Sequence, residues 1–191
     1  MKIYIIEKLR QRMEYIKLYF RHDDIVFVEE DFFSFMQKTN VECIVSPANS
    51  FGLMDGGYDL ALSEWFGPQL QKNVQQYIID NYYGEQPVGT SFIIDANEKG
   101  QKLIHTPSMQ TPREILDPFV VYQCMRTTLM CAYKNNVKSI LIPLFGGGCG
   151  GVHPQTIAKM MKMAYDQIHN PPDKLDWSYA DIAEVSSRTI R

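Results

Sequence analysis

The stretch that decides the fold lies late in the chain, at residues 137–154, and reads VKSILIPLFGGGCGGVHP. Residues 137–143 form a nearly continuous apolar run, which is the pattern of a central strand buried on both faces of a sheet. Five glycines then fall within residues 146–151, and a helix is expected to begin near Pro154. A strand, a glycine loop and a helix in this order favour a phosphorylated ligand, because they bring free N–H groups to the carboxyl edge of a sheet.

This glycine loop fits neither of the standard nucleotide-binding motifs. No Lys-Ser or Lys-Thr pair follows residues 146–151, which excludes a P-loop, and the loop comes too late to be the first turn of a dinucleotide-binding fold. Each glycine costs about 1 kcal/mol relative to alanine in regular structure, and a tight turn with positive φ needs only one or two of them. We therefore expect a ligand to approach the backbone of this loop closely.

Strands and helices alternate along the rest of the chain. Hydrophobic periodicity predicts strands at residues 2–6, 25–29, 41–45, 90–95, 102–106 and 137–143. It predicts helices at residues 7–20, 32–38, 58–66, 69–83, about 118–135, and from residue 154 onward. This order predicts an α/β fold. We expect one domain over residues 1–170 and a polar tail over 171–191, packed on the domain or loosely ordered, with Trp177 and Tyr179 as its only candidate anchors.

Composition excludes several classes of protein. The chain has 191 residues, of which 45% are hydrophobic, and this is enough for one core. The formal net charge is -3, so we expect no extended nucleic-acid surface. The N-terminal apolar run meets Glu7 too early for a signal peptide or a membrane span. We therefore expect a cytoplasmic protein that does not associate with membranes.

The four cysteines are too few and too scattered for a disulfide framework, and they contain no Cys-x-x-Cys pair. Cys124 and Cys131 are seven residues apart, which places both on one helical face, so we expect them to be core thiols. Cys149 and His153 resemble half of a zinc site, but no second pair lies near them in sequence. We expect no bound metal and no cofactor.

A second glycine-containing segment, residues 49–61, reads NSFGLMDGGYDLA. It resembles the signature of the macro domain family, in which an Asn-bearing turn is followed by a glycine-rich loop and by an Asp just after paired glycines. Residues 142–154 resemble the second loop of that family. Residues 103–112, LIHTPSMQTP, resemble the strand and Pro-flanked loop between them in one of its subgroups. The similarity runs from about residue 31 to residue 168.

The resemblance implies a three-layer α/β/α sandwich with a central mixed β-sheet, and a cleft that binds ADP-ribose, a close derivative or an ADP-ribosylated substrate. By that resemblance, Asp31, followed by Phe32, accepts a hydrogen bond from the adenine amine. Asn49 contacts the distal ribose hydroxyls, and Gly56 and Gly57 border that ribose. In the second loop, Gly147, Gly148, Cys149 and Gly150 offer backbone N–H groups to the diphosphate. Gly146 of the same loop also borders the ligand, and Phe145, at the mouth of the loop, packs against it.

Each of these assignments has a simpler structural alternative. Asp31 is also suited to capping the helix predicted at residues 32–38. Asn49 is suited to an Asx-turn after Pro47. Phe145 lies at a strand end, where an aromatic side chain commonly belongs to the core. An acidic residue at the position of Asp59 is favoured by the helix dipole alone.

The resemblance implies three functions for the cleft. The first is hydrolysis of ADP-ribosyl linkages, for which Asp59 is the candidate catalytic residue that orients or deprotonates a water molecule. The second is a non-catalytic reader or sponge of ADP-ribose, of ADP-ribosylated partners or of ADP-ribose-derived signal nucleotides. The third is a phosphatase acting on ADP-ribose 1″-phosphate. The chain departs from the commonest family pattern at residues 46–47, 54–55 and 63, so binding is better supported than hydrolysis.

Overall fold

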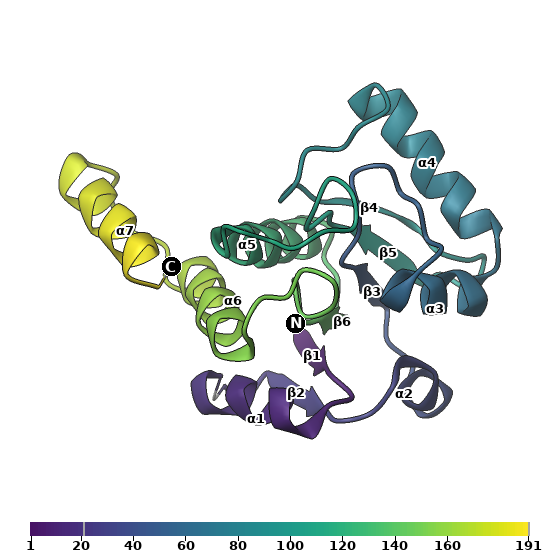
Figure 1. The fold of residues 1–191 in the computed structure, drawn as a ribbon, viewed down its shortest axis with the longest axis horizontal. Helices are drawn as coiled ribbons and strands as arrows, with labels where there is room; N and C mark the ends of the chain where they lie inside the picture. Colours follow the sequence, from purple (N-terminus) through teal and green to yellow (C-terminus); the bar gives the residue numbers. More distant parts are fainter. Residues whose placement is uncertain (21, 191) are drawn as a thin grey trace.

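The computed structural model describes the backbone of residues 1–20 and 22–190 and the side chains of residues 1–20 and 22–184. Strands and helices alternate along most of this length (Figure 1). The strands are β1 (Lys2–Ile6), β2 (Ile25–Val28), β3 (Cys43–Ser46), β4 (Phe92–Asp95), β5 (Lys102–His105) and β6 (Ser139–Pro143). The helices are α1 (Arg10–Tyr19), α2 (Phe32–Lys38), α3 (Gly57–Phe66), α4 (Gln69–Tyr82), α5 (Phe119–Lys134), α6 (Pro154–His169) and α7 (Trp177–Ile190).

The strands form one mixed sheet in the order β2-β1-β6-β3-β5-β4. Four neighbouring pairs are parallel, and β4 runs antiparallel to β5 at one edge. β6 lies inside the sheet between β1 and β3, and its last four residues are buried. The apolar run at residues 137–143 therefore predicts its central position correctly, and the predicted α/β fold is confirmed.

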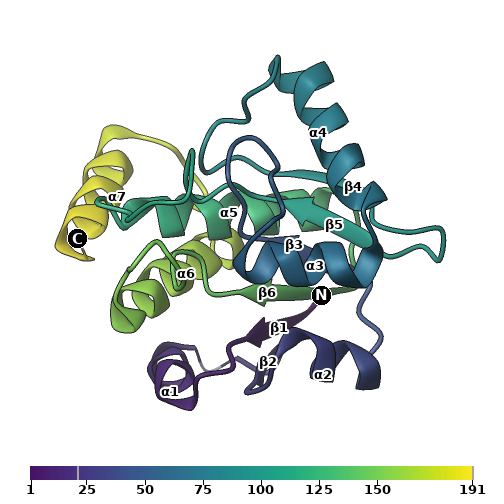
Figure 2. The same ribbon diagram turned by 45° about the vertical axis from the view of Figure 1, so that its right-hand side comes forward.

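Side chains that alternate along the strands supply two separate cores, one on each face of the sheet. On β3, Cys43 and Val45 join the cluster that includes buried side chains of α1, α5 and α6. Ile44, between them, joins the cluster that includes side chains of α2, α3 and α4. Each buried aliphatic side chain stabilises the fold by about 1.5–3 kcal/mol. The sheet lies between these two groups of helices (Figures 1 and 2), so the expected three-layer sandwich is present.

Some predicted bounds differ from the observed ones by up to three residues, because local hydrogen bonds set the ends. The first helix begins at Arg10 rather than at Glu7, since the Glu7 carboxylate accepts a hydrogen bond from the Leu9 N–H at 2.8 Å. The third strand begins at Cys43 and extends to Ser46. Within the described residues, no helix is long and apolar enough to span a membrane.

The C-terminal tail contains a helix that periodicity did not predict. α7 lies beside α6 at the edge of the molecule (Figure 1), where Gln167 Nε2 of α6 donates a hydrogen bond to the Tyr179 hydroxyl at 3.3 Å. Tyr179 thus contacts α6 through this hydrogen bond. Trp177, the other expected anchor, is 84% exposed.

Candidate functional site

The parallel strands β1, β2, β3, β5 and β6 all end at one edge of the sheet, and the loops after all five of them contribute to a cleft there. Its volume is about 870 Å³, which is in the range of small-molecule sites. The loop after β3 and the loop after β6 supply most of its walls, and the segments after β1 and β2 close one side. This is the edge at which the glycine loop predicted a ligand.

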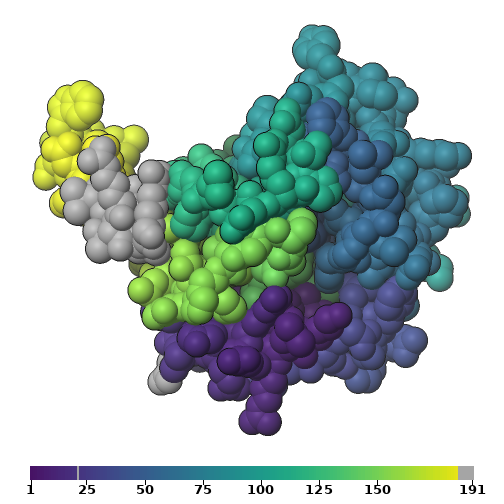
Figure 3. Space-filling model, in the orientation of Figure 1, coloured from purple at the N-terminus to yellow at the C-terminus, as the bar shows by residue number. Residues whose placement is uncertain are grey.

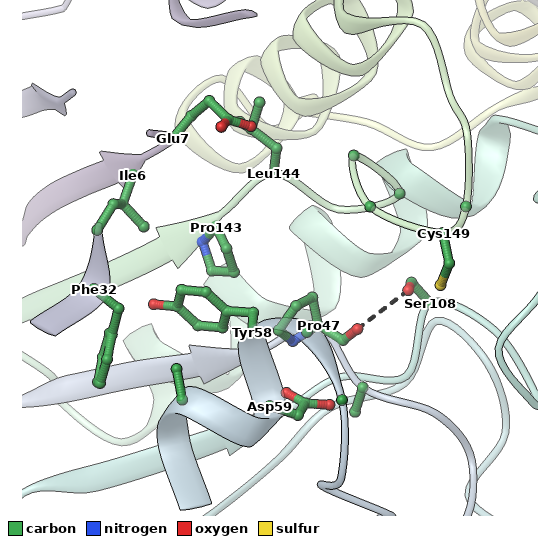
Figure 4. A pocket seen from close by; sticks show the side chains of 18 of the residues that line it. Ile6, Glu7, Phe32, Pro47, Tyr58, Asp59, Ser108, Pro143, Leu144 and Cys149 are labelled. Carbon is green, nitrogen blue, oxygen red and sulfur yellow. Dashed lines mark hydrogen bonds between the residues drawn. The ribbon is translucent and has the colours of Figure 1, made fainter. Parts of the chain in front are cut away.

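One end of the cleft is apolar. Figure 4 shows Ile6, Phe32, Tyr58 and Pro143 together at this end, whereas Ser108 and Cys149 lie at the other. The Phe32 and Tyr58 rings pack edge to face with centroids 5.4 Å apart. The Tyr58 hydroxyl is buried and has no hydrogen-bond partner among the described residues. A flat apolar group such as a nucleobase fits this end.

The loop after β6 presents free donors to the cleft. Its own turns occupy the N–H groups of Gly147, Gly151 and Val152, which donate to the carbonyl oxygens of Leu144, Gly148 and Gly146. The expectation that the Gly147 N–H binds the diphosphate is therefore wrong, because that N–H closes a turn within the loop. The N–H groups of Gly148, Cys149 and Gly150 have no acceptor among the described residues, and all three residues line the cleft. Three consecutive free N–H groups form a site suited to a phosphate.

The glycines of this loop are required for different reasons. A Cβ at Gly150 would lie 2.8 Å from Ile115 Cδ1 and 2.9 Å from the Gly146 Cα. A Cβ at Gly146 would lie 2.9 Å from Val152 Cγ2, and Gly146 also has φ +74°. Only at Gly148, among the four glycines that line the cleft here, would a Cβ meet nothing within 4 Å.

The expectation that a ligand accounts for the whole glycine run is therefore corrected. Ile115, which comes from the loop before α5, packs over the second loop, and its N–H donates to the Gly150 carbonyl at 2.9 Å. Figure 3 shows the corresponding teal segment directly against the light-green loop. Close packing against Ile115 thus explains Gly150, and Val152 together with the positive φ explains Gly146, whereas open space toward the cleft remains at Gly148.

Phe145 does not belong to the site. Its side chain is fully buried in the core cluster that includes residues of α5 and α6, and it does not line the cleft. The alternative expected for an aromatic residue at a strand end is the correct one. Cys149, by contrast, is exposed at the cleft, with its Sγ 3.5 Å from Met109 Sδ.

The loop after β3 ends in an uncapped helix. Gly56 is the N-cap of α3 and supplies no side-chain hydrogen bond, and Gly57 has φ +58°. The N–H groups of Gly57, Tyr58 and Asp59 have no acceptor among the described residues, and all three residues line the cleft. The partial positive charge of this helix N-terminus therefore adds to the free donors of the second loop.

Asp59 lies in the first turn of α3 with 8% of its surface exposed. Ser46, the last residue of β3, donates a hydrogen bond from Oγ to Asp59 Oδ1 at 2.7 Å. Burial raises the pKa of Asp59 from its ordinary value of 3.8 to about 7, although the Ser46 hydrogen bond acts to lower it. Near neutral pH, the carboxyl group can therefore exchange a proton with a bound molecule.

Asn49 and Asp31 both line the cleft, and both also make the structural interactions proposed as alternatives. Asn49 Oδ1 accepts from the N–H groups of Phe51 and Leu53, and Nδ2 donates to the Leu53 carbonyl. Asp31 caps α2, since its two oxygens accept from the N–H and the hydroxyl of Ser34. Each side chain thus holds its loop in shape, and each retains hydrogen-bonding capacity toward the cleft.

Several residues that shape the site were not predicted from the sequence. Ser46 is visible in the sequence only as a departure from the family pattern, yet it holds Asp59. Lys8 and Arg12, from the segment after β1, are the only cationic side chains among the described residues that line the cleft. No motif marks them, because they reach the site only when β1 pairs with β6 and α1 packs against α6.

The cysteines lie in different environments. Cys43 and Cys124 are buried, and Cys131, expected to be a core thiol, is half-buried. Burial raises the pKa of all three thiols. Across residues 1–20 and 22–184, no group of three or more His, Cys, Asp or Glu side chains is arranged to hold a metal ion.

Comparison of the sequence with protein families finds a match to the macro domain family model over residues 45–161. An uncharacterized protein of Aquifex aeolicus is 30% identical over 125 residues, which cover 65% of this chain and 72% of the relative. An uncharacterized protein of Aeropyrum pernix is 25% identical over 130 residues, which cover 68% of this chain and 66% of the relative.

Solved structures share the fold. A mutant of the Oceanobacillus iheyensis macrodomain with ADPR matches with a TM-score of 0.61 and 23% identity, covering 72% of this chain and 76% of that one. The same macrodomain with ADP matches with a TM-score of 0.59 and 24% identity, and the match covers 66% of this chain and 68% of that one. The macrodomain of Mycobacterium tuberculosis DarG matches with a TM-score of 0.59 and 19% identity, and the match covers 69% of this chain and 85% of that one.

Proposed function

This chain belongs to the macro domain family, and we propose that its cleft binds ADP-ribose or an ADP-ribosylated substrate. The observation that carries the proposal is that two groups of backbone N–H donors without a hydrogen-bond acceptor among the described residues border the same cleft. They belong to residues 148–150 and to residues 57–59. A diphosphate between the two loops would satisfy donors on both sides. Such donors bind an anion without help from a basic surface, in keeping with the net charge of -3.

The rest of the ligand follows from the two ends of the cleft. The adenine lies at the apolar end beside Phe32, with its amine directed to the Asp31 carboxylate. A guanine presents a carbonyl oxygen at that edge, and a carboxylate has no hydrogen to donate to it. The distal ribose lies at Gly56 and Gly57, beside Asn49 and Asp59. The exposed Cys149 borders the diphosphate through its backbone.

Two properties of the solved relatives support this arrangement. Structures of the Oceanobacillus iheyensis macrodomain hold ADPR or ADP. Variants of that macrodomain change an asparagine, a glycine seven residues later and an aspartate three residues after that. Asn49, Gly56 and Asp59 have the same spacing in this chain.

Calorimetry tests the binding step. ADP-ribose should bind with micromolar affinity, which corresponds to about −8 kcal/mol. AMP should bind much more weakly because it lacks the second phosphate and the distal ribose, and the guanine analogue should bind more weakly than ADP-ribose. A folded sample that gives no heat with ADP-ribose would remove the proposal.

For the reaction, hydrolysis of an ADP-ribosyl linkage is the candidate that the geometry supports best. A water molecule attacks the anomeric carbon of the distal ribose, and Asp59 accepts its proton. The bond from that carbon to the acceptor breaks, and the acceptor leaves with the bonding electron pair and takes up a proton from solvent. A base with a pKa near 7 is matched to this task at neutral pH. Release of free ADP-ribose from ADP-ribosylated protein or nucleic acid tests the step.

A non-catalytic reader is the second candidate. Two sets of hydrogen bonds favour it, between Asp59 and Ser46 and between Asn49 and its own loop. They give both side chains a structural role that requires no catalysis. A reader would bind ADP-ribose as tightly as proposed and release none from any acceptor. Phosphatase action on ADP-ribose 1″-phosphate would use the same cleft, and release of phosphate from that compound distinguishes it.

A further inference from the structure

Arg12 connects the N-terminal part of the chain to the second glycine loop. Its Nη1 donates a hydrogen bond to the Gly147 carbonyl oxygen at 2.6 Å, across 135 positions of sequence. The Glu7 carboxylate lies 3.6 Å from the same nitrogen. Arg12 belongs to α1, which lies outside the residues 45–161 that match the family model. The contact is therefore a feature of this chain beyond the matched motifs.

This hydrogen bond fixes the orientation of one peptide group. A peptide bond is planar and trans, so the Gly147 carbonyl and the Gly148 N–H point in opposite directions. Holding the carbonyl toward Arg12 consequently directs the Gly148 N–H away from Arg12. That N–H is one of the free donors bordering the cleft.

The peptide needs such a restraint because glycine stands on both sides of it. Glycine reaches left-handed as well as right-handed backbone angles at little cost, so the peptide between Gly147 and Gly148 can rotate. Rotation by half a turn would replace the N–H with the Gly147 carbonyl oxygen. A carbonyl oxygen directed at a diphosphate is repulsive, and the phosphate site would be lost.

We propose that Arg12 is a positioning residue for the phosphate site: it holds the Gly147–Gly148 peptide with its N–H directed at the bound diphosphate. The inference rests on the proposed binding of ADP-ribose and names the part of the chain that prepares the site for it. Glu7 keeps the guanidinium beside the loop. Arg12 takes part in no bond-breaking step.

A general charge effect is the competing explanation, since Arg12 and Lys8 are the only cations among the described cleft residues. Arg12→Gln removes the restraint and the charge together. Arg10→Gln, two residues earlier on an exposed part of α1, removes the same charge without touching the loop. Both variants should unfold at temperatures close to that of the original protein.

Calorimetry with ADP-ribose and with adenosine separates the two explanations. Arg12→Gln should weaken ADP-ribose binding at least about tenfold, the effect of losing one hydrogen bond from a charged donor. Adenosine, which has no phosphate, should bind as before. The loss should persist at about 0.5 M salt, where screening removes long-range charge effects. Arg10→Gln should bind both ligands normally.

Several results would overturn the proposal. They are unchanged ADP-ribose affinity in Arg12→Gln, a loss that disappears in salt, an equal loss in Arg10→Gln, and an equal loss for adenosine. The amide resonance of Gly148 in ligand-free protein gives an independent measurement. It should shift or broaden in Arg12→Gln and stay unchanged in Arg10→Gln. Should the original protein not bind ADP-ribose, the proposed function itself fails, and the Gly148 resonance still reports whether Arg12 restrains the peptide.

Discussion

The Ser46 hydroxyl lies 2.7 Å from Asp59 Oδ1 and donates a hydrogen bond to it, which joins the end of β3 to the first turn of α3. The hydrogen bond favours the ionised carboxylate, whereas burial favours the neutral acid. Burial has the larger effect, so the pKa of Asp59 rises to about 7. The first three predictions follow from this balance.

Asp59→Asn should lower hydrolytic turnover by about 10²–10⁴-fold, because the amide keeps the shape of the side chain but cannot accept a proton. The affinity for ADP-ribose should change little. Turnover is measured as ADP-ribose released from an ADP-ribosylated acceptor, and affinity by calorimetry. An active original protein with an equally active Asp59→Asn variant would contradict the role of Asp59.

Activity should depend on pH through the ionisation of Asp59. Only the carboxylate can act as a base, so turnover should rise about tenfold per pH unit below pH 7 and level off above it. ADP-ribose affinity, measured at each pH, serves as the control. A turnover that is flat or falls between pH 5 and pH 8 would exclude Asp59 as the base.

The stability of the folded protein should also depend on pH through Asp59, but it should fall as pH rises, whereas turnover should increase. Between pH 3.8 and about pH 7, the folded protein holds a proton on Asp59 that the unfolded chain has released. The contribution of Asp59 to stability is therefore lost as pH rises through this window. Asp59→Asn cannot ionise, so above pH 7 it should be more stable than the original protein by about 4 kcal/mol, and this advantage should vanish near pH 4.

Thermal unfolding of the ligand-free protein at pH 4 and pH 8 measures the effect. Asp55→Asn is the matched control, because Asp55 is exposed in the same loop and should show no comparable gain. If Asp59→Asn were equally stable or less stable than the original protein at pH 8, burial of the ionised carboxylate would not be destabilising the fold.

Gly148→Glu should abolish ADP-ribose binding and leave the fold intact. A Cβ at Gly148 meets nothing within 4 Å, so the side chain enters the cleft and brings a negative charge to the phosphate site. Ser178→Glu adds the same charge on exposed α7 and should bind normally. Gly150→Ala, in contrast, should lower the melting temperature, because its Cβ would clash with Ile115. Normal binding by Gly148→Glu would mean that the second loop is only a structural turn.

Asp31→Ala should weaken ADP-ribose binding by about 1.5–3 kcal/mol, the range for a hydrogen bond to a charged group. It should also reduce the preference for adenine over hypoxanthine, which lacks the amine. Ser34→Ala is the control, since it removes a capping hydrogen bond and leaves the carboxylate in place. A loss that is equal for both bases, or equal in the two variants, would assign Asp31 to helix capping alone.

The sequence by itself determined the class of fold and the edge of the sheet that carries the cleft. The apolar run before the glycine loop has the length and continuity of a buried strand, and β6 takes that place between β1 and β3. Hydrophobic periodicity is a local property, so it located nearly every helix and strand. It missed α7, whose described side chains at residues 177–184 are exposed except for Tyr179, so that the helix adds nothing to the core.

Only the tertiary structure decided what each site residue does. Ile115 and Gly150 are 35 positions apart, so the sequence could not show that packing rather than a ligand requires glycine there. Phe145 turned out to face the core, and the pKa of Asp59 depends on burial by residues from distant segments. Arg12 reaches Gly147 only because β1 pairs with β6, the strand before the loop, and α1 packs against α6, the helix after it. Spacing along the chain fixes local conformation, but contacts, burial and charge at a site arise from segments that meet only when the chain is folded.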